Sequence, residues 1–460
     1  MSAAPHPFRI ANYRFYWFTR LFSMLAVYAM MLIVAWQAYN LARETMGIAG
    51  ASARLGLIGL LQFIPLFCLT PVTGWVADHM DRRWVVRIVL SALAAIAGTL
   101  ALLTYSQSMT LALLYFMAVL LGTARAFLGP AQGALAPNLV PKEVLPQAIA
   151  LSTIAWQFGA LVGPGIAGPL YGIAPHLPYT LSAILYAASA ICMFFVGDVP
   201  RSAPKRTGPI EQIVEGARYV WRNKLVFGAI TLDLFAVLLA GATALIPVFA
   251  RDIIDLDWSA DMIGGPVGDW VRGSPEHALS LLAASPAVGA AVVAAIFSIV
   301  PLKSNVGVKM LVAVFVFGGA TIAFGFSTLL WFSMLCLFVV GASDMFSVYI
   351  RQSLIQLNTP DDKRGRVGAV SQLTISASNE LGEAESGFLA ALIGPVWAVV
   401  AGGIGAMAIT AVWIRLFPQL AGAKTFDPSD EVLASEPDAM ERGAGPKVEQ
   451  ETKSKAEGTP

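Results

Sequence analysis

The sequence is poor in charge and in cysteine for its length. Asp, Glu, Lys and Arg make up only 13% of the 460 residues, about half the share of an ordinary soluble domain. The 30 Lys and Arg residues are balanced by 29 Asp and Glu residues, so no excess of positive charge points to a nucleic-acid partner. The three cysteines lack CxxC spacing and indicate neither a disulfide framework nor a metal site.

Hydrophobic residues are abundant instead. They form 57% of the chain, and the mean hydropathy is +0.68. This composition excludes a soluble globular enzyme, a disordered protein and a fibrous protein. A membrane-spanning helix needs about 20 mainly apolar residues. Twelve such runs lie near residues 18–42, 55–77, 84–105, 108–136, 147–172, 177–198, 225–250, 277–300, 306–326, 328–352, 367–391 and 394–417. The sequence therefore predicts an all-α integral membrane protein with twelve transmembrane helices in the lipid bilayer.

The distribution of Lys and Arg predicts the orientation of these helices. The N-terminus, the even-numbered loops and the C-terminal tail together contain 25 of the 30 basic residues. The odd-numbered loops contain four, namely Arg43, Arg54, Arg251 and Arg272, and Arg125 lies inside a span. Because basic residues are retained in the cytoplasm, we expect both termini to be cytoplasmic. The acidic segment 251–276 is then an external loop, either simply solvated or forming an electrostatic vestibule.

Composition also divides the chain into segments. Residues 1–198 and 225–417 each contain six predicted spans, and residues 199–224 between them form a basic, proline-containing linker with an amphipathic run. Residues 418–460 become rich in Glu, Lys, Gly, Pro and Ser, a composition that favours disorder. We expect two six-helix bundles, a cytoplasmic linker and a disordered cytoplasmic tail.

An internal repeat supports this division. A shift of 219 residues superposes Leu135 on Leu354, Pro141 on Pro360, Ser152 on Ser371, Gly163 on Gly382 and Gly168 on Gly387. The same shift places Arg125 on Asp344, each a charged residue inside its span. Repeated halves are the plan of many secondary transporters.

Six charged side chains lie well inside the predicted spans, away from their ends: Arg125, Asp233, Asp344, Glu380, Glu383 and Glu385. Each costs about 2.5–3.5 kcal/mol at the bilayer centre, so they should face protein or a water-filled cavity. Glu380 and Glu383 share one face of a helix, while Glu385 points elsewhere. Two adjacent carboxylates in a low dielectric cannot easily both be ionised. These residues are therefore candidates for proton coupling, and structural pairing is the alternative.

Residues 74–83 read GWVADHMDRR. This segment resembles the signature between the second and third helices of the major facilitator superfamily, roughly G-x-L-x-D-x-x-G-R-R/K. The resemblance implies a gate formed by Gly74, Asp78, Arg82 and Arg83, although Asp81 stands where the family usually has Gly. A positive loop with an incidental Asp is the other interpretation.

Residues 159–168 read GALVGPGIAG and resemble the superfamily's exporter-associated motif G-x-x-x-G-P-x-x-G-G. Gly159, Gly163 and Gly168 would allow close helix contacts, and Pro164 would allow a bend. A purely structural packing role is equally open. Segments around Asp233 and Asp344, together with residues 356–366 and 379–387, resemble a bacterial branch of transmembrane secretion effectors. That resemblance implies a location in the bacterial inner membrane.

These observations predict a secondary transporter that works by alternating access, with protons and a small organic molecule as its partners. Proton-coupled export of a drug-like or siderophore-like compound is the leading hypothesis. Import or lipid movement by the same fold is the alternative, and a membrane-embedded enzyme or a non-transporting scaffold is a further one. The sequence contains no GxxxxGK[ST], HExxH or GxSxG motif, so we expect no catalytic residues, no metal and no cofactor. No obligate protein partner is evident.

Overall fold

A computed structural model describes residues 6–198, 209–300, 302 and 304–426. Every regular element within these residues is helical, and none is a strand. In a bilayer, helices satisfy each backbone hydrogen bond within the segment, so long apolar runs fold in this way. The predicted all-α architecture is confirmed.

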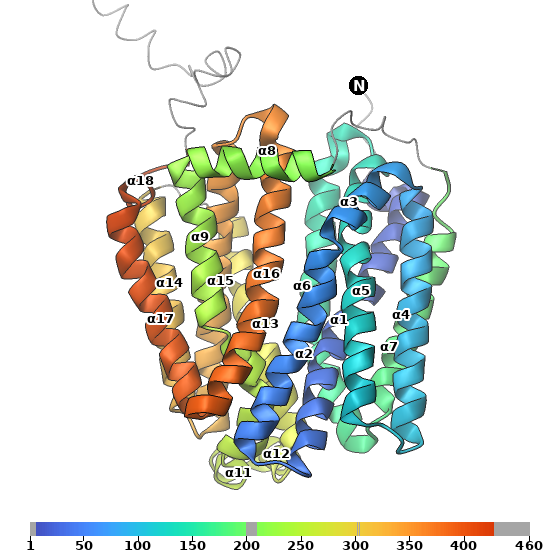
Figure 1. The fold of residues 1–460 in the computed structure, drawn as a ribbon, viewed down its shortest axis with the longest axis vertical. Coiled ribbons are helices and arrows are strands. Elements are labelled where there is room, and N and C mark those ends of the chain that lie inside the picture. Colours follow the sequence, from blue (N-terminus) through green and yellow to red (C-terminus); the bar gives the residue numbers. More distant parts are fainter. Residues whose placement is uncertain (1–5, 199–208, 301, 303, 427–460) are drawn as a thin grey trace, which may run out of the picture.

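The N-terminal half contains seven α-helices, arranged upright beside one another (Figure 1). They are α1 (Ala11–Arg43), α2 (Ile48–Cys68), α3 (Thr70–His79), α4 (Arg82–Tyr105), α5 (Leu111–Leu135), α6 (Leu145–Ile173) and α7 (Leu177–Phe194). Three short 3₁₀ turns accompany them: η1 (Pro7–Arg9), η2 (Ala136–Asn138) and η3 (Lys142–Val144).

The linker helix α8 (Pro209–Arg222) leads into the C-terminal half. The long helices there are α9 (Lys224–Leu239), α13 (Pro275–Ile299), α14 (Val306–Gly325), α15 (Leu330–Leu357), α16 (Asp361–Ile393) and α17 (Pro395–Leu416). The shorter elements are η4 (Ala242–Leu245), α10 (Ile246–Val248), η5 (Phe249–Ile253), α11 (Leu256–Ile263), α12 (Gly265–Val271) and α18 (Pro418–Ala421). Helix α8 lies across one end of the molecule, and α11 and α12 lie at the other end (Figure 1).

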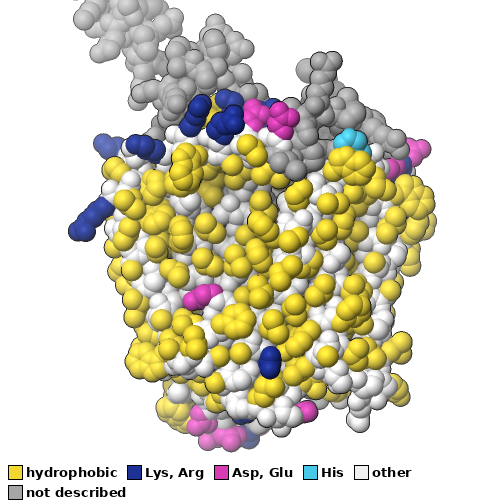
Figure 2. Space-filling view, viewed as in Figure 1, with side chains coloured by type: hydrophobic (Ala, Val, Ile, Leu, Met, Phe, Trp, Pro, Cys, Tyr) yellow, Lys and Arg dark blue, Asp and Glu magenta, His cyan; other side chains and the backbone are white. Residues whose placement is uncertain are grey.

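Eleven segments of the described residues are long and apolar enough to cross a membrane. The predicted span that is missing from these eleven, 367–391, corresponds to α16, which is 33 residues long and runs between the two ends of the molecule beside α2 (Figure 1). It is absent from the eleven, and it carries the acidic residues Glu380, Glu383 and Glu385. Figure 2 shows hydrophobic side chains over the middle of one face, with most charged side chains at its two ends.

Several predicted boundaries differ from the structure. The second predicted span, 55–77, is instead α2 from Ile48 followed by α3 after a break at Leu69, with Pro65 and Pro71 on either side of that break. The seventh span is interrupted between α9 and η4, where Gly241 packs against the backbone of Gly382. The predicted external loop 251–276 is largely helical, because η5, α11 and α12 lie within it.

The internal repeat matches the helix boundaries. Helix α5 begins at Leu111 and α15 at Leu330, and 330 minus 111 equals the predicted shift of 219. The same shift superposes most of α6 on α16 and of α7 on α17. The division into bundles at 1–198 and 225–417 stays a prediction. Residues 199–208 of the linker and 427–460 of the tail lie outside the described residues.

Buried apolar residues form separate cores in the two halves. One core contains only residues between Tyr13 and Val196, and two smaller cores contain only residues from 220 onward. A fourth core combines Trp36, Tyr39 and Leu55 of the N-terminal half with Phe249 and Leu282 of the C-terminal half. Its helices meet near α11 and α12, so the two halves share a hydrophobic core at that end.

Candidate functional site

A largely buried ion pair between α5 and α16 joins the two halves. Nη2 of Arg125 on α5 lies 3.0 Å from Oε1 of Glu380 on α16, and the exposed fractions of the two side chains are 21% and 6%. Nη1 of Arg125 donates a hydrogen bond of 2.9 Å to Oε1 of Gln62 on α2. The guanidinium therefore connects two helices of the N-terminal half to α16 of the C-terminal half.

Glu380 and Glu383 both lie at the contact between α16 and α2. The backbone oxygen of Glu380 and the Cβ of Glu383 are among the atoms that a Cβ at Gly59 would meet, at 3.3 and 3.0 Å. The second carboxylate oxygen of Glu380, Oε2, is buried without a hydrogen-bond partner. Two acids and one arginine thus share the boundary, and one negative charge is left to be neutralised by a proton or by a cation.

Glycines bring α2 and α16 close enough for this arrangement. A Cβ added to Gly387 would lie 2.4 Å from the Cα of Gly56, so only glycine fits at both positions. Small residues in membrane helices permit such backbone contact. The same packing fixes where Glu380 and Glu383 lie along the length of α2, close to Gln62, and therefore positions the ion pair.

A second buried ion pair lies inside the C-terminal half. Asp233 of α9 pairs with Arg351 of α15, and their side chains are 9% and 3% exposed. Arg351 is one of the 25 basic residues that the sequence count placed on the cytoplasmic side, as part of the loop after the span 328–352. That placement is wrong, because α15 continues to Leu357 and buries Arg351. The position of Arg351 within the predicted span 328–352 was the signal that could have identified it. Arg351 is therefore a second positively charged residue inside the bundle, in addition to Arg125.

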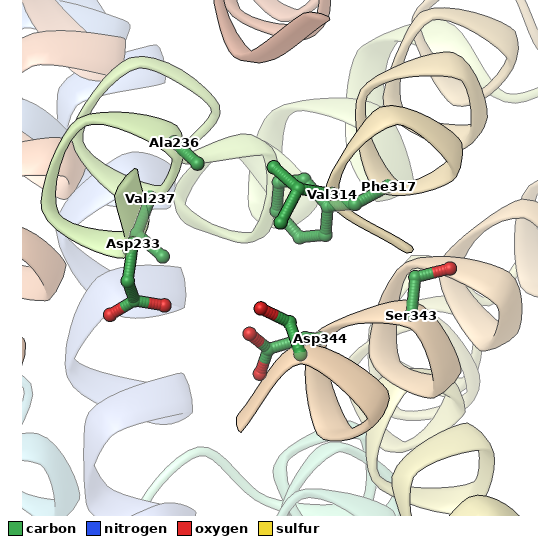
Figure 3. Close-up of a pocket in the computed structure, with 8 residues that line it drawn as sticks. Asp233, Ala236, Val237, Val314, Phe317, Ser343 and Asp344 are labelled. Carbon is green, nitrogen blue, oxygen red and sulfur yellow. The ribbon is translucent and has the colours of Figure 1, made fainter. Parts of the chain in front are cut away.

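Asp344 lies in a small pocket next to this pair. The pocket lies between α9, α14 and α15, and Figure 3 shows the carboxylates of Asp233 and Asp344 facing each other across it. Arg125 and Asp344 occupy equivalent positions in the repeat, yet they have different surroundings: Arg125 pairs with Glu380, whereas Asp344 faces Asp233. Glu385 is half-buried and meets the hydroxyl of Ser386 at 3.5 Å, away from both groups.

The predicted gate segment spans α3 and the start of α4. Gly74 and Asp78 lie in α3, and the side chain of Asp78 lies outside the described residues. Asp81 is the N-cap of α4, because its carboxylate accepts a 3.0 Å hydrogen bond from the backbone N–H of Arg83. Arg83 also lies 2.7 Å from both Asp81 and Asp198. An N-cap carboxylate stabilises the start of a helix. This role explains in structural terms why Asp81 can stand where the family usually has Gly.

The predicted packing motif lies in α6 and contacts both halves. Gly159 and Gly163 pack against Met24 and Leu25 of α1, within the N-terminal half. Further along α6, Ser280 of α13 accepts a 2.9 Å hydrogen bond from the N–H of Gly168. The same hydroxyl donates a 2.8 Å hydrogen bond to the carbonyl of Pro164. The motif therefore contributes directly to the boundary between the halves.

A polar cluster ties α1 to η5 near α11 and α12, and sequence analysis did not identify it. Asp252 accepts hydrogen bonds from Tyr39 at 2.6 Å and from Arg43 at 3.1 and 2.9 Å. Arg251 donates to Asn40 in the same region. Arg251 and Asp252 belong to the segment 251–276, which was predicted to be a solvated loop or a vestibule. The structure instead places them in a latch between the halves, which we call the Asp252 latch.

These features describe a multi-pass helical membrane protein whose buried charges lie at and beside the boundary between its two halves. Residues 16–383 match the family model described as the Major Facilitator Superfamily. The chain belongs to this superfamily, whose members are membrane transporters of small molecules rather than enzymes.

Several curated relatives are similar to the chain. An uncharacterized MFS-type transporter, y4rN, of Sinorhizobium fredii is 30% identical over 47% of this chain and 57% of its own length. The staphyloferrin A transporter of Staphylococcus aureus is 27% identical over 43% of this chain and 51% of its own length. The chain thus spans little more than half the length of these two relatives. The enterobactin exporter EntS of Shigella boydii is 23% identical over 80% of this chain and 84% of its own.

Solved structures share the fold. A bacterial homologue of the human lysosomal transporter Spinster, in an inward-facing and unoccupied conformation, matches with a TM-score of 0.65 at 14% identity. The match covers 90% of this chain and 99% of that one. A POT family transporter in complex with a thioalcohol-conjugated peptide matches with a TM-score of 0.69 at 14% identity, over 91% and 99% of the two chains. At these identities the likeness concerns the fold alone.

Proposed function

We propose that this chain exports a small organic molecule in exchange for protons, by alternating access. The observation that carries the proposal is the ion pair between Arg125 and Glu380, which joins α5 to α16 across the boundary of the halves. Alternating access requires the halves to move against each other, so a charged contact at this boundary is remade in every cycle. Protonation of the carboxylate weakens that contact and thereby links proton binding to the movement.

Glu383 is the leading proton carrier in this proposal. It lies one helical turn from Glu380 on the same side of α16, against Gly59 of α2. A proton can be held by Glu383 while Glu380 stays paired with Arg125, and it can pass to Glu380 when cargo draws the guanidinium away. Sequence analysis named Asp344 among the candidates for proton coupling, but Asp344 lies inside the C-terminal half. The geometry favours the residue at the boundary.

The relatives support export as the direction. One is named as an enterobactin exporter and another as a tetracycline resistance protein, while a third is named as a staphyloferrin A transporter. We propose a drug-like or siderophore-like cargo on this basis. Import remains the second candidate, because the fold is shared with peptide transporters. The distribution of basic residues supports an orientation with both termini in the cytoplasm, and the bacterial relatives support an inner-membrane location.

The test is transport in proteoliposomes with and without an imposed pH gradient. Enterobactin and tetracycline serve as probes, and the wild type is compared with Glu383→Gln and Asp344→Asn. Since Gln mimics a protonated carboxyl group, Glu383→Gln should abolish uphill export while exchange down the cargo gradient survives. The proposal fails if wild-type flux ignores the pH gradient, or if Glu383→Gln responds to the gradient as the wild type does. Asp344→Asn shows whether coupling also requires the acid inside the C-terminal half.

A further inference from the structure

The pocket beside Asp233 and Asp344 is separate from the site at the boundary. Its walls come from α9, α14 and α15 of the C-terminal half. Ala236, Val237, Val314 and Phe317 supply the apolar part of the wall. The polar part consists of Asp233, Asp344, Ser343 and Ser347, so every polar side-chain atom that lines the pocket is an oxygen.

The charges around the pocket do not cancel. Asp233 is paired through Oδ1 with Arg351, and no hydrogen bond or ion pair satisfies Asp344 among the described residues. Two carboxylates and one guanidinium leave one negative charge. An ionised carboxylate within the membrane is costly unless a positive charge accompanies it. The pocket thus calls for a single positive charge next to Asp344.

Two serine hydroxyls add ligand atoms of the same kind. Ser343 and Ser347 are 8% and 4% exposed, and neither hydroxyl has a hydrogen-bond partner among the described residues. Ser353, on the same helix, instead donates a 2.8 Å hydrogen bond to the carbonyl of Tyr349 four residues earlier, as helical serines commonly do. No donor is bonded to the hydroxyl oxygens of Ser343 and Ser347 among the described residues, so the lone pairs of both oxygens are available. Carboxylate and hydroxyl oxygens are the donors that hard cations prefer.

We propose that this small pocket binds a monovalent cation, and sodium is the ion chosen to test it. Asp344 would supply the charge, and Ser343, Ser347 and the second oxygen of Asp233 would supply further ligands. A single net negative charge matches a monovalent ion better than a divalent one. Such a site would hold α9 and α15 together on opposite sides of the ion (Figure 3). The proposal does not depend on the cargo or on the proton coupling described above.

Thermal unfolding of the purified full-length protein tests the site, with the fluorescence of its 11 tryptophans as the readout. Measurements in NaCl, KCl and choline chloride at equal ionic strength separate a specific cation from salt screening. Because bound ligand stabilises the folded state, NaCl should raise the midpoint in a saturable manner, and binding of radioactive ²²Na⁺ should follow the same curve. Both responses should vanish in Asp344→Asn.

Two further variants keep the test decisive if Asp344→Asn folds poorly. Ser347→Ala removes one neutral ligand and should weaken sodium binding by about fivefold. Asp261→Asn changes an exposed acid in α11, whose side chain is 65% exposed, and should leave the sodium response intact. Glu383→Gln should also retain it, which separates this site from the proposed proton carrier.

Equal midpoints for the wild type in all three salts would overturn the proposal. So would a sodium response that survives in Asp344→Asn. A midpoint that depends on pH through Asp344 and not on sodium would show that the residue binds only a proton, and this result also contradicts the cation site.

Discussion

The two buried ion pairs differ in what they connect. Asp233 and Arg351 lie within the C-terminal half, on α9 and α15, and are almost fully buried. Glu380 and Arg125 connect the two halves, and 21% of the Arg125 side chain remains exposed. A contact inside one half can persist through a transport cycle, whereas a contact between halves has to break and re-form. The comparison teaches that an intramembrane charge can stabilise a bundle or control its movement, depending on where its partner lies.

The largest expected effect comes from matched substitutions in the two pairs. Asp233→Asn leaves Arg351 buried and unpaired, which should lower the free energy of unfolding by about 3–5 kcal/mol. Glu380→Gln leaves Arg125 with its hydrogen bond to Gln62 and partial exposure, so the loss should be clearly smaller. Thermal midpoints in one detergent measure both variants. Adding Arg351→Gln to Asp233→Asn should recover part of the loss. Equal destabilisation by the two single variants would contradict the distinction.

The gate segment provides the next test. The signature implies that Asp78 takes part in a contact between the halves. If it does, Asp78→Asn should reduce transport roughly 5- to 150-fold, which is the fold-change that typical coupling free energies between two sites produce. Membrane insertion and the thermal midpoint should stay near those of the wild type. Asp255→Asn is the control, because it removes the N-cap of another helix, α11, at the opposite end of the molecule (Figure 1). Loss of folded protein in parallel with transport would instead assign Asp78 a structural role.

The Asp252 latch should have a more modest effect. Asp252→Asn weakens two hydrogen bonds from Arg43. At the end near α11 and α12, it should shift the equilibrium between contact and separation of the two halves toward separation by about 1–2 kcal/mol. Distances between spin labels on α11 and at the end of α1 measure the shift. Asp255→Asn changes the N-cap of α11 and should leave these distances unchanged. An unchanged distribution in Asp252→Asn would show that the apolar core holds this end closed without the latch.

The smallest perturbation tests which end of the molecule is external. A cysteine replacing Asp261, in a background without Cys68, Cys192 and Cys336, should react with an impermeant thiol reagent in intact cells. Asp261 is exposed, so its substitution should not disturb the fold. A cysteine at Arg222 of α8 provides the opposite control and should react only after lysis. Reversed labelling would overturn the orientation predicted from the basic residues.

Sequence analysis was most successful where structure depends on local composition. Apolar runs identified the spanning helices, and the shift of 219 residues matched α5 with α15. The break between Leu239 and Ala242 was missed because it depends on the packing of Gly241 against Gly382 of α16. Neither residue signals a break by itself within an apolar run.

The partners of the candidate site residues could not be predicted in the same way. Arg43 and Asp252 are 209 residues apart in sequence, and Arg125 and Glu380 are 255 residues apart. A charged residue in a span signals that a partner exists, but several partners satisfy that requirement equally. Only the packing of the helices in the folded protein selects among these partners. The site residues could be predicted as a group, while the pairing had to come from the fold.

The polar character of α16 also has a consequence for biogenesis. Helices are released into the bilayer according to their own hydrophobicity, and α16 is not among the eleven described segments that satisfy the spanning criteria. Its stable insertion depends on neighbours that are already present, and α2, with which it makes its closest backbone contacts, is synthesised more than 300 residues earlier. We therefore expect the N-terminal half to act as an intramolecular template for the insertion of α16. Coexpressed halves should accumulate together, and the C-terminal half alone should be degraded.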